Sequence, residues 1–204
     1  MAAKGTITTS DYLPIEEFYR LVECLRKDKQ YVWELLCCIS IMTALRISDI
    51  LHLKWCDILL WSSILVKEKK TGKTRKIAFN AANHARIKEL YKLLDEPDIN
   101  SFIISTSDKE TSYSRQYINR KLKEFKVIYK LKISKFSTHT FRKTFGRNLY
   151  NTMENKTEAL VLLMDVFKHS SVDTTKRYIG LNDEDVRQAY NHINFNHAIK
   201  ISRK

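Results

Sequence analysis

The sequence of 204 residues predicts one mainly helical domain that carries a single small antiparallel β-sheet. Three observations favour this fold class. Most of the chain repeats apolar residues at helical spacing, whereas short strand-like runs are confined to residues 58–79. Those runs flank Thr71-Gly72, a dipeptide that is typical of a tight turn. Only four glycines and two prolines are present, which leaves little sequence for long loops or linkers.

The first elements can be placed from the spacing of apolar residues. Residues 1–10 are small and polar and are expected to form a flexible arm. A helix should follow Pro14, because the apolar residues after it share one stripe. These residues are Ile15, Phe18, Leu21, Val22 and Leu25. Residues 31–45 are apolar nearly all round, which predicts a buried central helix, and residues 46–55 should form a further helical turn.

The remaining elements follow a strand region. Short strands are expected at 58–60, 64–67 and 75–79. Helices are then expected at 81–94, 114–129, 138–151, 158–167 and from about Ser171 onward. Asn182-Asp183 should cap a last helix that runs toward His192. The expected organisation is therefore an arm at 1–10, a main domain at 11–181 and a C-terminal helix or tail at 182–204.

The chain is strongly basic. Its 36 Lys and Arg residues exceed its 23 Asp and Glu residues, which gives a formal net charge of +13. In a folded chain of mixed charge, this excess of positive charge points first to nucleic acid as the partner. The alternative is a protein that is basic but binds no nucleic acid. Membrane binding is disfavoured, because no basic amphipathic helix stands apart and the apolar run at 31–45 contains Glu34 and is too short to span a bilayer.

Cysteine usage and the N-terminus indicate a cytoplasmic protein. Cys37 and Cys38 lie inside the apolar run, and together with Cys24 and Cys56 they lack the spacing of metal ligands. They are expected to be reduced thiols. The first residues are polar and do not form a signal peptide.

Six residues form a set that is suited to attack on a phosphodiester. Guanidinium and imidazole groups can hold a phosphate and its developing charge. A lysine can protonate a leaving oxygen, and a tyrosine hydroxyl can act as the nucleophile. The residues are Arg46, Lys70, His139, Arg142, His169 and Tyr178.

Arg46 and the lysine-rich hairpin each have a structural alternative. Arg46 follows the most apolar helix, where a charge must be paired or face a site. Asp49 could pair with Arg46, and it could also direct Arg46 toward a phosphate as a supporting residue. A basic hairpin tip is ordinarily exposed to solvent, but its charge also suits contact with a DNA backbone. Lys69 and Lys73 are alternatives to Lys70 for the role of general acid. Expected DNA-binding residues are Lys67, Lys69, Lys73, Arg75, Lys143, Lys176 and Arg177.

The sequence around His139, Arg142, His169 and Tyr178 also bears on whether they are functional or structural. His139 and Arg142 would share a helix face, and Ser137 can cap that helix so that His139 lies in its first turn, where an anion is favoured. A single histidine such as His169 is more often structural, and Tyr178 is one of ten tyrosines. Tyr178, however, ends a polar and basic segment in which an apolar anchor is not expected.

Taken together, these segments resemble the tyrosine recombinase (phage integrase) family. Residues 44–51 (Ala-Leu-Arg-Ile-Ser-Asp-Ile-Leu) resemble its first arginine box, and residues 139–142 (His-Thr-Phe-Arg) resemble its His-x-x-Arg box. Residues 169–178 resemble the segment from the second histidine to the nucleophile, and Lys70-Thr-Gly resembles the hairpin lysine. The match runs from about residue 10 to residue 180, and four boxes in this order are far more specific than any one of them.

The resemblance implies the family's catalytic-domain fold and chemistry. Tyr178 would attack the scissile phosphate to form a 3′-phosphotyrosyl link, His139 would accept its proton, and Lys70 would protonate the leaving 5′-oxygen. The non-bridging oxygens would be held by Arg46, Arg142 and His169. The resemblance implies no metal or nucleotide cofactor. It implies double-stranded DNA as the partner, a homo-tetramer on DNA and weak or no association without it.

The function that follows is a site-specific DNA recombinase of the integrase or invertase type, as mobile elements carry. The alternatives are a relaxing enzyme that resembles type IB topoisomerases and a non-catalytic DNA-binding regulator. Phe167-Lys168 stands where the family usually has Leu-Gly. Only about a dozen residues precede the domain, where the family usually has a DNA-clamping domain, so a shortened chain or a short stand-alone member is expected. The tail at 182–204 is expected to pass to a neighbouring subunit.

Overall fold

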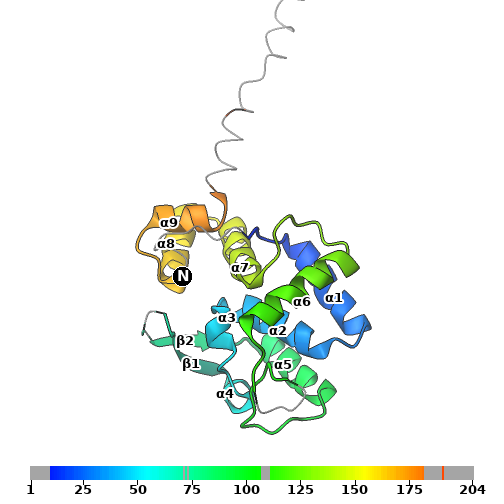
Figure 1. Cartoon of the computed structure of the whole chain (residues 1–204). Helices are drawn as coiled ribbons and strands as arrows, with labels where there is room; N and C mark the ends of the chain where they lie inside the picture. Colours follow the sequence, from blue (N-terminus) through cyan, green and yellow to red (C-terminus); the bar gives the residue numbers. More distant parts are fainter. Residues whose placement is uncertain (1–9, 71, 73, 107–110, 182–189, 191–204) are drawn as a thin grey trace, which may run out of the picture.

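The computed structural model describes residues 10–70, 72, 74–106, 111–181 and 190, and it is mainly helical with one small sheet (Figure 1). The helices before the sheet are α1 (Ile15–Lys27), α2 (Tyr31–Thr43), α3 (Ile47–Ile50) and α4 (Trp55–Leu59). The strands are β1 (Ser63–Lys67) and β2 (Thr74–Ala78). The later helices are α5 (Ala81–Leu93), α6 (Arg115–Ile128), α7 (Thr138–Thr152), α8 (Lys156–Phe167) and α9 (Val172–Tyr178).

The structure confirms the predicted fold class and most of the predicted elements, with ends that mostly agree to within about two residues. The helical turn expected at 46–55 is shorter, because α3 ends at Ile50 and a separate helix, α4, begins at Trp55. The strand expected at 58–60 is wrong, because these residues lie in and just after α4. Trp55 and Ile58 are spaced three apart and are both buried on one face of that helix. The Asp57 carboxylate also accepts a 2.8 Å hydrogen bond from the Lys54 N–H and so caps the helix. The arm at 1–9 and the predicted helix at 182–192 lie outside the described residues, except for Tyr190.

Helix α2 forms the centre of the main core. It packs against α1, α5 and α7, and its side chains are buried on nearly every face, as its apolar sequence predicts. The helix ends because Ala44 adopts a left-handed conformation with φ of 49°. The chain then turns at once into Arg46 and α3, which places this arginine at the end of the most buried helix.

The two strands form an antiparallel hairpin whose register runs from Ser63 opposite Ala78 to Lys67 opposite Thr74. One face of the hairpin is buried through Ile64, Val66 and Ile77. In Figure 1 the hairpin lies on the same side of the molecule as α8 and α9. The Arg75 side chain of β2 donates to the Val166 carbonyl at 2.8 Å, which joins the hairpin to α8.

A second, smaller apolar cluster holds the C-terminal helices in place. Its buried members are Ala44, Leu160, Leu163, Phe167, Ile179 and Leu181. Gly146 of α7 lies against this cluster, and a Cβ at that position would lie 2.7 Å from Ile179 and 2.8 Å from Phe167. The close approach packs the middle of α7 against the ends of α8 and α9, beside Ala44 at the end of α2. Among the described residues, no helix is both long and apolar enough to cross a membrane.

Candidate active site

Two of the predicted arginines meet where α2 and α8 end. The Arg142 guanidinium donates to the carbonyl of Ala44 and, at 2.9 Å, to the carbonyl of Phe167. Arg46 donates to the same Phe167 carbonyl at 3.4 Å. Helix C-termini carry partial negative charge, so both ends stabilise a guanidinium there. Arg142 is only 3% exposed, and its side chain also lies over the Phe167 ring, 4.5 Å from the centroid.

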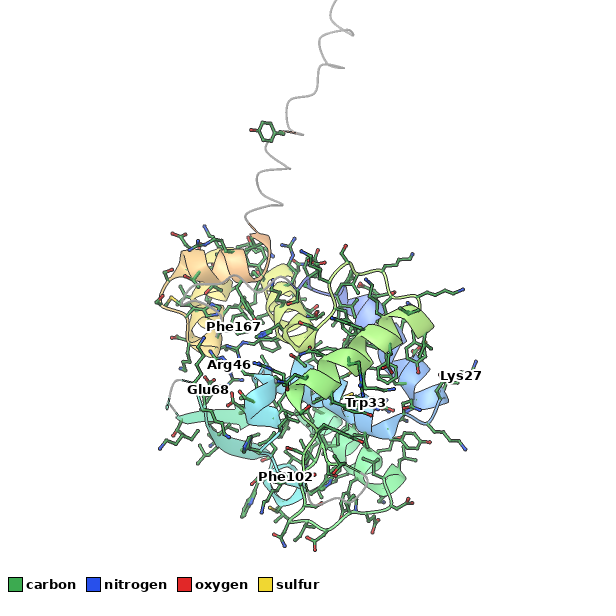
Figure 2. The ribbon with its side chains drawn as sticks, in the orientation of Figure 1. Lys27, Trp33, Arg46, Glu68, Phe102 and Phe167 are labelled. Carbon is green, nitrogen blue, oxygen red and sulfur yellow. The ribbon has the colours of Figure 1, made fainter. Side chains whose placement is uncertain are left out.

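A third arginine and a buried glutamate complete this cluster. Arg75 of β2 donates to the carbonyls of Thr43 and Val166, the second at 2.8 Å. Glu68 is 1% exposed and forms an ion pair with Arg46 at 2.5 Å and with Arg75 at 3.6 Å. Figure 2 shows the labelled Arg46, Glu68 and Phe167 grouped between the hairpin and the C-terminal helices. A carboxylate in this position offsets the repulsion between two guanidiniums.

Asp49 does not occupy the place that the sequence suggested. Arg46 and Asp49, both described by the structure, form no ion pair, and Glu68 takes that role instead. Asp49 is 3% exposed and accepts a hydrogen bond of 3.0 Å from the backbone N–H of Lys69. The carboxylate therefore fastens the hairpin to α3. Arg46 has an extended backbone and lies before the first residue of α3, so Arg46 and Asp49 do not share a helix face as the spacing of three residues would suggest.

His139 lies at the start of α7 and is predominantly neutral. Ser137 caps the helix by accepting a hydrogen bond from the His139 N–H at 3.3 Å. Burial is the largest cause that lowers the pKa of His139 to about 4, and the charges of Arg142 and Arg115 add to it. A neutral imidazole at neutral pH can accept a proton. The nearby cations also mean that an arriving anion is attracted to this helix start.

His169 and Tyr178 come together as rings. Their centroids are 5.0 Å apart at an interplanar angle of 73°, and the Phe167 ring lies 5.3 Å from His169 and 5.2 Å from Tyr178. The His169 Nδ1 atom contacts the Thr175 hydroxyl at 3.1 Å, which orients the imidazole. Burial, followed by the charges of Arg142, Arg46 and Lys70, lowers the pKa of His169 to about 4.

The Tyr178 hydroxyl is enclosed and close to the arginines. Its oxygen is buried and has no hydrogen-bond partner of regular geometry among the described residues. Burial raises the pKa of Tyr178, whereas the nearby guanidiniums of Arg142 and Arg46 act in the opposite direction. The Lys143 ammonium lies 5.5 Å from the centre of the Tyr178 ring. The hydroxyl is therefore protonated in the free protein, and its ionised form would be stabilised by several cations.

The three rival hairpin lysines differ in their surroundings. The Lys69 ammonium contacts His52 Nε2 at 2.6 Å. Lys70 is exposed and forms no hydrogen bond or ion pair with another described residue, but its charge is among those that lower the pKa of His169. Lys73 lies outside the described residues. Of the two lysines that can be compared, Lys70 is the one whose charge reaches the cluster.

The expected DNA-binding residues fall into two groups. Lys67, Lys69 and Arg177 are exposed and Lys176 is half-buried. Arg75 and Lys143 are turned inward. Arg75 binds backbone carbonyls and Lys143 is only 7% exposed beside Tyr178. Arg75 and Lys143 therefore lie inside the cluster, and their contact with DNA stays a prediction.

Glu68 is the residue of this cluster that the sequence reasoning missed. It lies among Lys67, Lys69 and Lys70, so the run reads as a solvated basic turn. The alternation of β1 contains the signal, because Ile64, Val66 and Glu68 are two residues apart and all point to the buried face. An acidic residue in phase with buried apolar residues indicates a buried partner of positive charge.

Comparison with known proteins gives a consistent result. The sequence model of the "Phage integrase family" matches residues 11–185. A protein of Bacillus subtilis (strain 168) described as "Probable integrase/recombinase YoeC" is 32% identical over 177 residues, which covers 84% of this chain and 93% of that protein. A "Probable integrase/recombinase" of Acholeplasma phage L2 is 28% identical over 158 residues, which covers 74% of this chain and half of the phage protein.

Similar solved structures share the fold at lower identity. The XerA recombinase structure superposes with a TM-score of 0.68 at 21% identity and covers 93% of this chain and 66% of its own. The XerH site-specific recombinase, in a post-cleavage complex with a palindromic difH substrate, has a TM-score of 0.65 at 21% identity and covers 88% of this chain and 52% of its own. The lambda integrase catalytic core has a TM-score of 0.56 at 21% identity, with 75% and 90% covered.

Proposed function

The chain belongs to the phage integrase family and is by that membership a site-specific tyrosine recombinase, and we propose that it cleaves and rejoins double-stranded DNA through Tyr178. The observation that carries this proposal is the position of the Tyr178 hydroxyl, which is buried without a regular hydrogen-bond partner and faces the charges of Arg142 and Arg46. A buried hydroxyl beside two guanidiniums is placed to exchange its proton for a bond to an anionic phosphate.

The proposed reaction balances without an external cofactor. The Tyr178 oxygen attacks the phosphorus, the bond from phosphorus to the 5′-oxygen breaks, and a 3′-phosphotyrosyl link forms. His139, which is neutral because burial lowers its pKa, accepts the tyrosine proton. Lys70 protonates the leaving 5′-oxygen. Attack by a 5′-hydroxyl on the link reverses these steps and releases Tyr178.

The arginines can hold a phosphate without leaving their present partners. A guanidinium has five N–H donors, and the hydrogen bonds of Arg142 to the carbonyls of Ala44 and Phe167 use two of them. The remaining donors can bind non-bridging oxygens while the carbonyl contacts keep the group in place. His169 would donate a further hydrogen bond from Nε2 once its ring is protonated, a form that an arriving phosphate favours, while Thr175 holds its Nδ1 side. Such preorganised donors stabilise charge that develops in the transition state.

The assembly that we propose is a homo-tetramer that forms on DNA in the cytoplasm, with the domain at 11–181 as the catalytic unit and the tail at 182–204 exchanged between subunits. The high positive charge of the chain supports attraction to DNA. Sedimentation with and without a cleavable duplex tests this assembly. Tetramers that depend on the duplex and disappear when residues 182–204 are removed would support both parts of the proposal.

A covalent-adduct experiment tests the function without knowledge of the natural target. The protein is incubated with a pool of nicked duplexes of random sequence, in which the cleaved fragment diffuses away and traps the adduct. Wild-type protein should yield DNA-linked protein on a denaturing gel, and Tyr178→Phe should yield none. A wild-type protein that binds these duplexes but never forms adduct would instead be a regulator. Relaxation of supercoiled DNA without pairing of two duplexes would indicate the topoisomerase alternative.

A further inference from the structure

His52 and Lys69 form a contact that the proposed chemistry does not use. His52 Nδ1 lies 2.7 Å from the carbonyl oxygen of Ser48, and its Nε2 lies 2.6 Å from the Lys69 ammonium. A carbonyl only accepts hydrogen bonds, so Nδ1 must carry the proton. Nε2 of the neutral ring is then the acceptor for Lys69. Both nitrogens have a defined role, so the ring is fixed in one orientation.

The same hairpin residue is held at a second point. The Asp49 carboxylate accepts the backbone N–H of Lys69 at 3.0 Å. Asp49 and His52 are three residues apart at the end of α3, so the two contacts come from one short segment. One fixes the main chain of Lys69 and the other fixes its side chain.

Three successive residues of the hairpin have different surroundings. Glu68 turns inward to Arg46 and Arg75. Lys69 is held on the α3 side, where it lines a groove together with His52 and the exposed Trp61. Lys70 is exposed, and its charge contributes to the lowered pKa of His169. Loss of the His52 contact would remove one of the two restraints on Lys69, the residue next to Lys70.

We infer that His52 is a positioning residue for the general acid, because it holds Lys69 away from the substrate and thereby keeps Lys70 directed at the leaving 5′-oxygen. This inference rests on the proposed function, since it gives His52 a role only in a reaction that protonates that oxygen. His52 itself touches neither the substrate nor the reacting atoms in this account.

The test uses a duplex in which sulfur replaces the bridging 5′-oxygen, because a thiolate leaves without the help of an acid. The duplex is one that wild-type protein converts to adduct in the random-sequence experiment. With the oxygen substrate at saturating protein, His52→Ala should form adduct roughly threefold to tenfold more slowly than wild type, the effect of one lost hydrogen bond. On the sulfur substrate its rate should match that of wild type. His52→Gln, which keeps an acceptor near Nε2, should restore most of the rate on the oxygen substrate.

Three further variants define what each outcome means. Lys70→Ala should show a much larger defect that sulfur removes, Lys69→Met should behave like His52→Ala, and Arg46→Ala should remain slow on both substrates. Equal slowing of His52→Ala on both substrates, or no slowing on either, would overturn the inference while leaving the recombinase function intact. A wild-type protein that forms no more adduct than Tyr178→Phe on both substrates would overturn the function itself.

A second measurement does not depend on cleavage. The ¹⁵N shifts of the His52 ring should show a proton on Nδ1 and none on Nε2, and Lys69→Met should shift the Nε2 resonance. A ring that carries its proton on Nε2 would contradict the contact and with it the inference. The protein remains folded in this comparison, because Lys69 and His52 are both exposed.

Discussion

The Arg46 guanidinium and the Glu68 carboxylate form a 2.5 Å ion pair that joins the end of the most buried helix to the end of the first strand. Glu68 is 1% exposed, and the Arg46 side chain is 17% exposed. The pair therefore leaves part of the guanidinium accessible while its position is fixed from within the protein. This arrangement suits a group that must hold a phosphate in one place.

Replacement of Glu68 by glutamine should destabilise the protein. Removal of one partner from a buried ion pair leaves the other charge uncompensated, at a cost of about 3 kcal/mol, and here both Arg46 and Arg75 lose a partner. Urea unfolding should show this decrease in the free energy of unfolding. Glu124→Gln is the matched control, because its pairs with Arg120 and Lys121 lie on the surface of α6 and should contribute less than about 1 kcal/mol.

Sulfate should reverse part of the Glu68→Gln defect. An anion that binds between the arginines replaces the missing negative charge, so added sodium sulfate should stabilise Glu68→Gln more than it stabilises wild type. Sodium chloride at equal ionic strength separates specific binding from screening. Equal responses to sulfate in both proteins would show that the arginines do not form an anion site.

Replacement of Gly146 by alanine should lower both stability and cleavage. Alanine favours a helix interior by about 1 kcal/mol over glycine, but its Cβ would lie 2.8 Å from the Phe167 ring and 2.7 Å from Ile179. Those residues flank His169 and Tyr178, so their displacement would disturb the nucleophile. Thermal unfolding and adduct formation measure the two effects. Asn151→Ala on the exposed part of the same helix is the control and should not reduce either.

Stability should fall between pH 6.5 and pH 4 because of the two site histidines. Burial, with the charge of Arg142 next, lowers the pKa of His139 and His169 to about 4 from the ordinary value of 6.5. In this window the unfolded chain binds protons on these rings and the folded chain does not, so their contribution is complete above pH 6.5 and decreases as the pH falls toward 4. His139→Gln should reduce the slope of unfolding free energy against pH in this window. An unchanged slope would contradict the lowered pKa.

Lys67 and Arg75 should behave in opposite ways despite their closeness in sequence. Lys67 is exposed, so Lys67→Met should leave stability unchanged and reduce the slope of log affinity for DNA against log salt by about 0.9 if this lysine neutralises one phosphate. Arg75 donates to the carbonyls of Thr43 and Val166. Arg75→Met should therefore destabilise the protein and leave the salt slope close to that of wild type. The reverse pattern would indicate that Arg75 contacts DNA directly.

Local sequence was sufficient for most elements of the fold. The stripe that includes Phe18 and Leu21, and the apolar run of α2, each predicted a helix that the structure contains. The error at residues 58–60 arose because three successive apolar residues suit a strand or a buried helix equally well. The Asp57 side chain, which caps the Lys54 N–H, distinguishes a helix from a strand at this position.

The contacts within the candidate site could not be predicted from short stretches of sequence. Arg46, His139 and Tyr178 are far apart in sequence, and their grouping followed from the family resemblance and not from spacing. The partners of the arginines depend on which helix ends meet, so the contacts of Arg142 with Ala44 and Phe167 could not be predicted. Glu68 continues the inward alternation of Ile64 and Val66 just past β1, but its partners Arg46 and Arg75 depend on how the hairpin packs against the helix ends.

The central claim is that Tyr178 forms the covalent bond to DNA, and mass spectrometry of the trapped adduct tests it most directly. Digestion of the adduct with nuclease and trypsin should release the peptide of residues 178–187, which contains no other tyrosine. We expect this peptide to carry the mass of a nucleotide residue, and the unmodified peptide to decrease in proportion to adduct formed. Nucleotide mass on a peptide that contains Tyr150 or Tyr190, with residues 178–187 unmodified, would contradict the account.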